Sequence, residues 1–232
     1  MRRRDLWRLA PVLLLGAATA PQLVPDVSQR DIDIQYSFTG ADLLLFGAIV
    51  YPDGNRPEKP ADIVVVLKGP EQSITMREKQ KVAGIWVNAD SRQFLDVPAY
   101  LAISSNRPID RIAPPDVRRR QQLGLDNVLL TQRVGTDYAD VVASDPFRSA
   151  FVRLRADHGL YREATSAVTF LTPTLFRTGI PLPAEVPIGT YNVDIQLFSN
   201  GALVTRTQTA FEVVKVGFEQ FIANTARHPG LA

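Results

Sequence analysis

The chain has 232 residues, of which 45% are hydrophobic and 22% charged, a composition typical of a globular protein with one large or two small domains. It contains no cysteine, which excludes disulfides, thiolate metal sites and cysteine nucleophiles. The formal net charge of +2 becomes −1 without residues 1–8, because that segment holds four of the 26 basic side chains and one of the 24 acidic ones. The charge therefore gives no support to nucleic-acid binding.

Residues 1–20 are predicted to be a signal peptide. They contain a basic segment that ends at Arg8, a short apolar run from Leu9 to Gly16, and the cleavage-like triplet Ala18-Thr19-Ala20. The apolar run is shorter than the roughly 18 residues that a spanning helix needs. The alternative is an uncleaved N-terminal anchor, and both interpretations predict export to the periplasm.

The first half of the mature chain is predicted to be β-structure, with strands at 31–38, 43–51, 63–67, 73–81, 84–88 and 98–105. The segments 43–51 and 63–67 are apolar on both faces, which favours central strands. The segment 73–81 is charged and is expected to be exposed. Trp86 has apolar neighbours on both sides, so we expect it to lie in a core between two sheets.

The middle of the chain is predicted to be helical. Pro114-Pro115 opens a short helical run over 116–123, which Gly124 closes. Asp145-Pro146 is typical of a helix start, with Asp145 as the N-cap and proline at the first helical position. One apolar stripe is predicted on this helix, from Phe147, Ala150, Phe151, Leu154 and His158, with Gly159 ending the helix. The side chains of Arg148, Arg153 and Arg155 are expected to project elsewhere.

The last third is predicted to contain a strand at 165–171, a proline-rich loop at 173–187 and a closing β-hairpin at 188–214. In the hairpin, apolar residues from Tyr191 to Leu197 alternate with polar ones, which predicts a strand with one buried face. Asn200-Gly201 favours a type I′ turn, because both central residues of that turn need a positive φ. After Val214, a short amphipathic helix is expected over 218–225.

These elements predict a mainly β protein: an Ig-like antiparallel β-sandwich of about nine strands with a helical insertion and a short C-terminal helix. The absence of a regular βαβ rhythm argues against a parallel α/β sheet. The predicted organisation is a signal peptide at 1–20, an exported sandwich at 21–214 with its insertion at about 114–163, and a short helix and tail at 215–232, which the family resemblance described below implies to be periplasmic and membrane-proximal, respectively.

No catalytic, cofactor or metal constellation is found in the sequence. The two histidines, His158 and His228, are far apart, and neither H-x-x-H nor EF-hand spacing occurs. No G-x-S-x-G motif is present. We therefore predict no catalytic residues, no cofactor and no metal.

Two features are candidates for binding. Arg118-Arg119-Arg120 is the one charge run, and it is either a solvated helix face or a docking patch for lipid head groups or an acidic partner. Tyr51, Tyr100 and Tyr138 are candidate exposed aromatics for a small-molecule or carbohydrate-binding module.

Six segments carry a resemblance to a known family: LLLFGA (43–48), VLKGP (66–70), GIWVN (84–88), FLTPTLFR (170–177), PAEVPIGTY (183–191) and KVGFEQFI (215–222). As an ordered set they resemble an uncharacterised transmembrane protein family of alphaproteobacteria. The resemblance implies a signal peptide, a periplasmic domain and a C-terminal membrane helix. This chain ends at Ala232, where that helix would begin, so we expect it to be truncated there; a member without the membrane helix is the alternative.

The resemblance further implies an accessory role beside an inner-membrane transporter of the sulfite-exporter type, and it transfers no activity or catalytic residues. Our leading hypothesis is a non-enzymatic periplasmic domain, membrane-tethered in the full-length protein, that serves as an accessory or interaction module for an inner-membrane protein. The alternative is a periplasmic small-molecule or carbohydrate-binding module.

Overall fold

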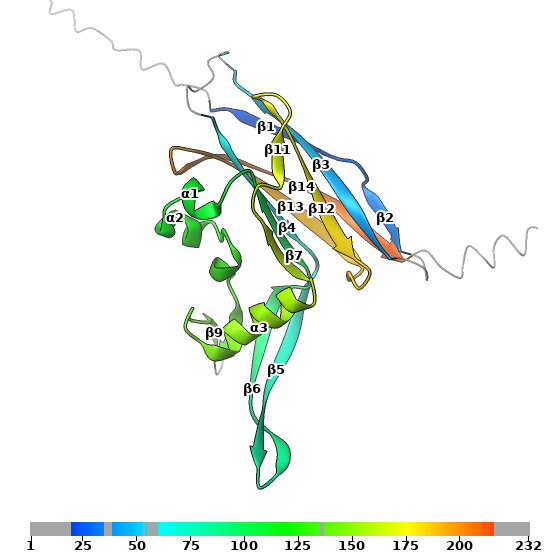
Figure 1. Cartoon of the computed structure of the whole chain (residues 1–232), viewed down its shortest axis with the longest axis vertical. Coiled ribbons are helices and arrows are strands. Elements are labelled where there is room, and N and C mark those ends of the chain that lie inside the picture. The colour runs from blue at the N-terminus through cyan, green and yellow to red at the C-terminus, as the bar shows by residue number, and fades with distance from the viewer. Residues whose placement is uncertain (1–19, 35–38, 53, 55–59, 135–136, 216–232) are drawn as a thin grey trace, which may run out of the picture.

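The computed structural model describes residues 20–34, 39–52, 54, 60–134 and 137–215, which form three β-sheets and four short helical segments (Figure 1). The prediction of a mainly β protein is confirmed. The predicted signal peptide, apart from Ala20, and the predicted helix over 218–225 lie outside the described residues.

The first sheet is antiparallel and has four strands in the order β1-β3-β12-β11. Its strands are β1 (Gln22–Val27), β3 (Gly40–Val50), β12 (Leu175–Pro183) and β11 (Val168–Phe170).

The second sheet has six strands in the order β10-β7-β4-β13-β14-β2 and is mixed, because its two outermost pairs are parallel. Its strands are β10 (Tyr161–Ala164), β7 (Leu101–Ser105), β4 (Asp62–Lys68), β13 (Gly189–Ser199), β14 (Ala202–Lys215) and β2 (Asp31–Ile34). The sheets are thus antiparallel and mixed, where the sequence predicted antiparallel pairing only.

The third sheet is antiparallel and has four strands in the order β5-β6-β8-β9. Its strands are β5 (Glu71–Val82), β6 (Ile85–Pro98), β8 (Thr131–Val134) and β9 (Asp137–Asp140). The helical segments are α1 (Ile109–Ile112), α2 (Pro115–Arg120), η1 (Leu125–Asn127) and α3 (Pro146–Asp157). The predicted helical insertion therefore also contains the short strands β8, β9 and β10.

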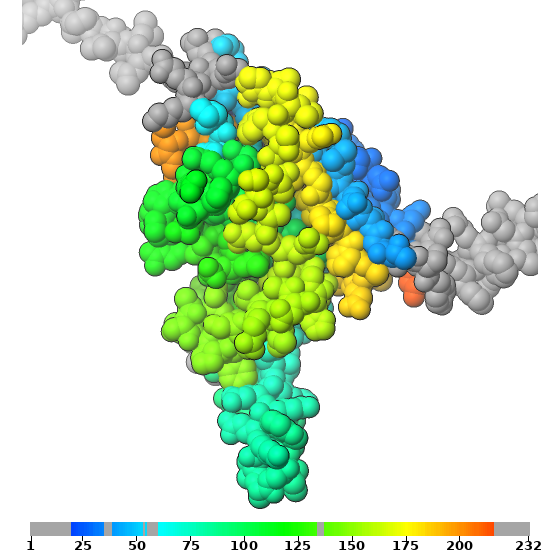
Figure 2. Space-filling view, viewed as in Figure 1, coloured from blue at the N-terminus to red at the C-terminus, as the bar shows by residue number. Residues whose placement is uncertain are grey.

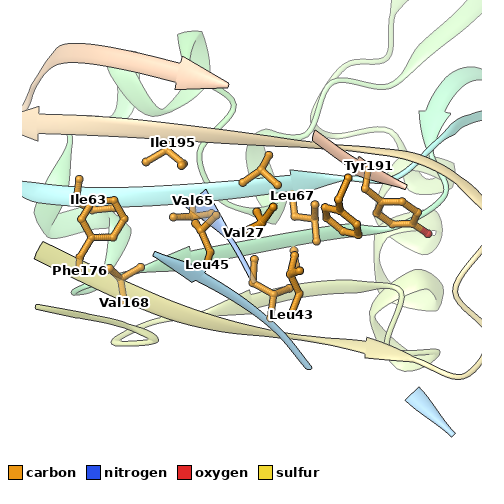
Figure 3. Close-up of a cluster of buried hydrophobic side chains, with 14 of the residues drawn as sticks. Val27, Leu43, Leu45, Ile63, Val65, Leu67, Val168, Phe176, Tyr191 and Ile195 are labelled. Atoms are coloured by element: carbon orange, nitrogen blue, oxygen red, sulfur yellow. The ribbon is translucent and has the colours of Figure 1, made fainter. Parts of the chain in front are cut away.

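The first hydrophobic core lies between the first and second sheets, and Figure 3 shows side chains of the two sheets directed toward one another. Leu43 and Leu45 of β3 and Phe176 of β12 meet Val65 of β4 and Ile195 of β13 there. The alternation of buried and half-buried residues in β3 shows a strand with one core face. In β4, Asp62 to Leu67 are all buried, as predicted for a strand covered on both sides.

A second core covers the opposite face of the second sheet. Val64 and Val66 of β4 and Phe198 of β13 pack with α1, α3 and the base of β6. This layer explains why Asp194 and Gln196 are buried, at 8% and 1% exposure, although alternation predicted that they face solvent. The strand β13 is central in its sheet and is covered on both faces.

The segment 173–187 is not the predicted loop, because β12 occupies most of it. The strand pairs with β3 from Leu175↔Ala48 to Pro183↔Gly40. Its prolines, Pro181 and Pro183, lie beyond Thr178, where β11 no longer pairs and β12 has only β3 as a neighbour. A strand with one open edge tolerates proline, since a nitrogen on that side removes no ladder hydrogen bond.

The start of α3 is as predicted, but the buried face of the helix is different. Asp145 Oδ1 accepts hydrogen bonds from the backbone N–H groups of Phe147 and Arg148. The buried residues are Arg148 and Phe151, whereas Leu154 is 42% exposed. A buried arginine therefore lies on the inner face of the helix, where helical periodicity predicts an apolar side chain.

The closing hairpin is confirmed. β13 and β14 pair antiparallel along their length, and the turn residues Asn200 and Gly201 have φ values of 50° and 83°. These positive values match the type I′ turn that the dipeptide predicts.

Three buried tyrosines make the fold sensitive to alkali. The hydroxyl of Tyr100 donates to the Pro181 carbonyl, that of Tyr161 to the Pro98 carbonyl and that of Tyr191 to the Pro187 carbonyl, at 2.7, 2.8 and 2.6 Å. Burial raises the pKa of Tyr100 to about 12, and it also raises the pKa of Tyr161 and Tyr191. Above pH 10.0, the ordinary value, the unfolded chain loses tyrosine protons that the folded protein retains.

We therefore expect the free energy of unfolding to fall as the pH rises above 10, by about 1.4 kcal/mol per pH unit for each such tyrosine. Urea unfolding at about pH 9 and about pH 11 measures this loss. Tyr100→Phe should reduce the loss, since phenylalanine does not ionise. Equal losses in Tyr100→Phe and the unmutated protein would contradict the role of Tyr100.

Candidate functional site

The feature that stands out is a long hairpin formed by β5 and β6. It projects from the body of the molecule, as Figures 1 and 2 show. Within the described residues, the third sheet continues beyond it only at Phe94 and Leu95, where β8 pairs with β6. Residues 77–91 therefore pair with one another alone, and all of them are exposed. We call this segment the distal hairpin.

The base of the hairpin is fixed to the body. Arg92 Nη1 lies 3.0 Å from Asp145 Oδ2 and 2.7 Å from Gln132 Oε1, and its guanidinium lies 5.3 Å from the centre of the Phe147 ring. Ile74 and Met76 of β5 pack against the second core. The distal hairpin thus extends from an anchored base.

The tip of the hairpin is apolar. A turn at Ala83 and Gly84, with φ values of 50° and 86°, joins the two strands. Beside it Val82, Ile85, Trp86 and Val87 are 56%, 69%, 66% and 40% exposed. The prediction that Trp86 lies in a core is wrong, because no second layer covers this part of the hairpin within the described residues.

Pairing across the hairpin sorts the tip residues into two faces. Val82 pairs with Ile85 and Gln80 with Val87, so one face presents three aliphatic side chains. Lys81 pairs with Trp86 and Lys79 with Asn88, so the opposite face presents the indole with two lysines beside it. The acidic residues Glu78 and Asp90 pair with each other one step closer to the body.

The hairpin leaves the body at the same end of the second sheet as the final strand. Gly189 at the start of β13 lies against Pro70, so closely that an added Cβ would be 3.1 Å from Pro70 Cβ. Gly189 also pairs with Val213 near the end of β14. The base of the hairpin and the last described residue, Lys215, therefore lie at the same end of the second sheet.

A groove of about 670 Å³ lies at the opposite end, between β4, α1 and the Asn200-Gly201 turn. Asp62 is buried on one side of it, and its carboxylate accepts two hydrogen bonds from Arg107 and one from Asn106. Asn106 Oδ1 in turn accepts from the Ile63 N–H. These groups are engaged with one another, and they hold the chain after β7 against β4.

A smaller pocket of about 270 Å³ lies beside Lys68 at the end of β4. Lys68 Nζ donates to Gln122 Oε1 at 3.1 Å. Burial lowers the pKa of Lys68, and the Asp194 carboxylate opposes this shift. Asp96 and Gln122, which also line the pocket, have φ values of 51° and 54°. Such backbone conformations are unfavourable for these residues and are often found at binding sites.

The three arginines of the run, Arg118 to Arg120, differ in their exposure to solvent. Arg118 is half-buried, and its Nε has no hydrogen-bond partner among the described residues. Arg119 is exposed, and Arg120 forms an exposed ion pair with Asp116 at 2.9 Å. Only two of the three predicted interaction residues are thus presented to solvent.

The tyrosines proposed for ligand stacking are not gathered either. Tyr100 is fully buried, Tyr51 packs against the first core and Tyr138 lies exposed on β9. None of them lines the two pockets described above. His158 is exposed at the end of α3, and His228 lies outside the described residues. Among the described residues, no group of three histidine, aspartate or glutamate side chains is placed to hold a metal.

Comparison with family models identifies the relatives of this chain. Residues 22–232 match the family described as "Putative transmembrane protein (Alph_Pro_TM)". The chain belongs to this family. No curated protein matches it. In the part of the chain that the structure describes, no helix of this family member is long and apolar enough to cross a bilayer.

The sequence missed the hairpin tip as a functional feature. In the sequence, a buried strand would show the same apolar pattern as Val82, Ile85, Trp86 and Val87. One signal was available: charged residues fill both faces of the preceding segment, from Arg77 to Lys81, and a strand that enters a core would not carry them.

Proposed function

We propose that this protein is a non-enzymatic periplasmic domain of an inner-membrane assembly. In this proposal it has an Ig-like sandwich, is tethered to the membrane after its last strand, and serves as an accessory or interaction module for an inner-membrane protein. The observation that carries the proposal is the distal hairpin. An exposed apolar tip on an anchored projection is a feature of interaction surfaces, because soluble domains otherwise avoid such patches.

The geometry of the second sheet supports a membrane-facing hairpin. A tether after Lys215 would leave from the end of the molecule where Gly189 and Pro70 lie in contact. The hairpin begins at that same end, so a tether there would bring the distal hairpin to the membrane side. Membership of a family described as transmembrane supports attachment to a membrane.

The proposed partner is an inner-membrane protein, and a transporter of the sulfite-exporter type is the candidate. An accessory domain on a tether needs little intrinsic affinity, since tethering raises the local concentration of both partners to the millimolar range. A modest surface such as the sides of the distal hairpin is therefore sufficient for binding.

Site-specific photocrosslinking in intact cells tests this proposal. A photoreactive residue at Ser91, which is exposed on the distal hairpin and lies outside its apolar tip, is expected to crosslink to a discrete inner-membrane protein. The matched control is Asn200, an exposed turn residue at the far end of the second sheet, which should give no such product. Absence of a membrane-protein product from Ser91, or equal products from both positions, would contradict the proposal.

The pocket beside Lys68 supports a second candidate function, the binding of a small polar molecule. The partly buried ammonium of Lys68 and the strained residues Asp96 and Gln122 favour it. A thermal-shift screen of small carboxylates and amino acids tests this function, since a ligand that binds the folded state raises the melting temperature. The shift should be lost in Lys68→Met, and a shift that persists there would exclude this pocket.

A further inference from the structure

We propose that the tip of the distal hairpin inserts into the interfacial region of an anionic lipid bilayer, with Lys79 and Lys81 at the level of the lipid phosphates. This inference deepens the proposed function and rests on it for the orientation of the domain. It specifies what the four apolar side chains of the tip contact.

The shape of the tip favours lipid over a protein pocket. The aliphatic side chains lie on one face of the ribbon, and Trp86 lies on the other face opposite Lys81, so each face carries an exposed apolar side chain at the tip. A protein partner would have to enclose the ribbon from both sides, whereas protein interfaces are usually one continuous patch on each partner. A bilayer surrounds an inserted hairpin on all sides.

The chemistry of the tip fits the boundary between water and hydrocarbon. Tryptophan is enriched at this depth, because its ring is apolar and its indole N–H needs a polar partner. Between residues 79 and 88 the only charged side chains are Lys79 and Lys81, and both are positive. Lysines beside an apolar tip attract anionic lipids and extend their ammonium groups to the phosphates.

The length of the apolar tip matches a shallow insertion. The tip comprises three cross-strand pairs, the last of which contains Val87, and at about 3.3 Å per residue the distance from the turn to Val87 is about 10 Å. Amphipathic segments that lie at a membrane interface bury their apolar side to about 5–10 Å. Deeper insertion would bring Glu78 and Asp90 and the unpaired edges of the ribbon into hydrocarbon, which is unfavourable.

Tryptophan fluorescence on vesicles tests the inference. Trp86 becomes the only tryptophan of the full chain after Trp7→Phe, since the sequence has two. We expect its emission to shift to shorter wavelength, and brominated lipids to quench it, on vesicles of phosphatidylcholine with phosphatidylglycerol. Lys79→Ala and Lys81→Ala should each weaken vesicle binding about fivefold, and Ile85→Ser about tenfold.

The matched control moves the probe to the body of the protein. In a chain with Trp7→Phe, Trp86→Phe and Val24→Trp, the indole replaces a valine that is 55% exposed on β1. Its emission should not shift, even where another segment of the chain binds the vesicle. Equal shifts for both probe positions, or no shift for Trp86, would overturn the inference.

The test also separates the inference from the proposed function. If Trp86 shows no shift on vesicles while Ser91 still crosslinks to a membrane protein in cells, the lipid inference fails and the proposed function stands. If Trp86 shifts equally on neutral phosphatidylcholine vesicles, the assignment of Lys79 and Lys81 to lipid phosphates is overturned.

Discussion

Replacing Phe176 with alanine is expected to lower the free energy of unfolding by about 3–5 kcal/mol, as is typical of a large buried aromatic residue. Phe176 is fully buried between the first and second sheets, and its ring lies 6.1 Å from the ring of Phe170. It extends from β12, so its loss should loosen the contact between that strand and β3. The midpoint of urea unfolding measures the effect.

A substitution at Gly47 tests the same packing, because the ring of Phe176 on β12 covers Gly47 on the neighbouring strand β3. The two residues are paired, and a Cβ added to Gly47 would lie 2.2 Å from Phe176 Cζ. Gly47→Ala is therefore expected to cost about 1–3 kcal/mol through overpacking. In the double variant the alanine methyl would occupy space that the ring has left, so the combined loss should be smaller than the sum.

Gly179, which lies on β12 as Phe176 does, provides the matched control for the glycine substitution. A Cβ at Gly179 meets no atom within 4 Å, and its backbone is not in the left-handed region. Gly179→Ala should therefore change stability by no more than about 0.5 kcal/mol. A large loss in Gly179→Ala, or strict additivity of the Gly47 and Phe176 variants, would contradict the proposed packing.

Replacing Arg148 with methionine is expected to cost about 2–4 kcal/mol of stability, although the new side chain is more apolar. Arg148 is 7% exposed, and its Nη2 donates to the carbonyls of Asp126 and Val128 at 2.6 and 3.0 Å. Methionine leaves both acceptors without their donor. This interaction ties α3 to the segment around η1, so its loss should affect the whole second core.

Arg153 supplies the comparison, because it lies on the same helix and is exposed. Arg153→Met should change the unfolding midpoint little, since surface substitutions usually stay within about 0.5 kcal/mol. Similar losses at both positions would show that the loss reflects helix propensity or net charge, and that the two carbonyl contacts of Arg148 contribute nothing.

The projecting hairpin changes how the family resemblance is interpreted. The matched segment GIWVN, residues 84–88, would be a core strand on the sequence alone, but in the structure it forms the exposed tip. A tethered domain with such a tip would have two points of attachment at one end of the molecule. Two attachments fix the orientation of a domain above a membrane better than one flexible tether does.

Several elements could be predicted from the sequence because local chemistry decides them. The Asn200-Gly201 turn follows from the need for positive φ, and the start of α3 follows from an aspartate N-cap before proline. The strand β4 follows from a continuous run of β-branched and aliphatic residues that only a doubly covered strand can bury. In each case the physical cause lies within a few neighbouring residues.

Other features were decided only by the tertiary structure, because burial depends on whether a second layer covers a strand. Trp86 is exposed because its hairpin extends past the first and second sheets. Arg148 is buried because two backbone carbonyls that are distant in sequence accept hydrogen bonds from its guanidinium. Pro181 lies in a strand because one edge of β12 is open. The candidate site has the same origin. The sequence by itself determined an apolar pattern around Trp86, and the tertiary structure left that pattern exposed, because no second layer of the described residues covers this part of the hairpin.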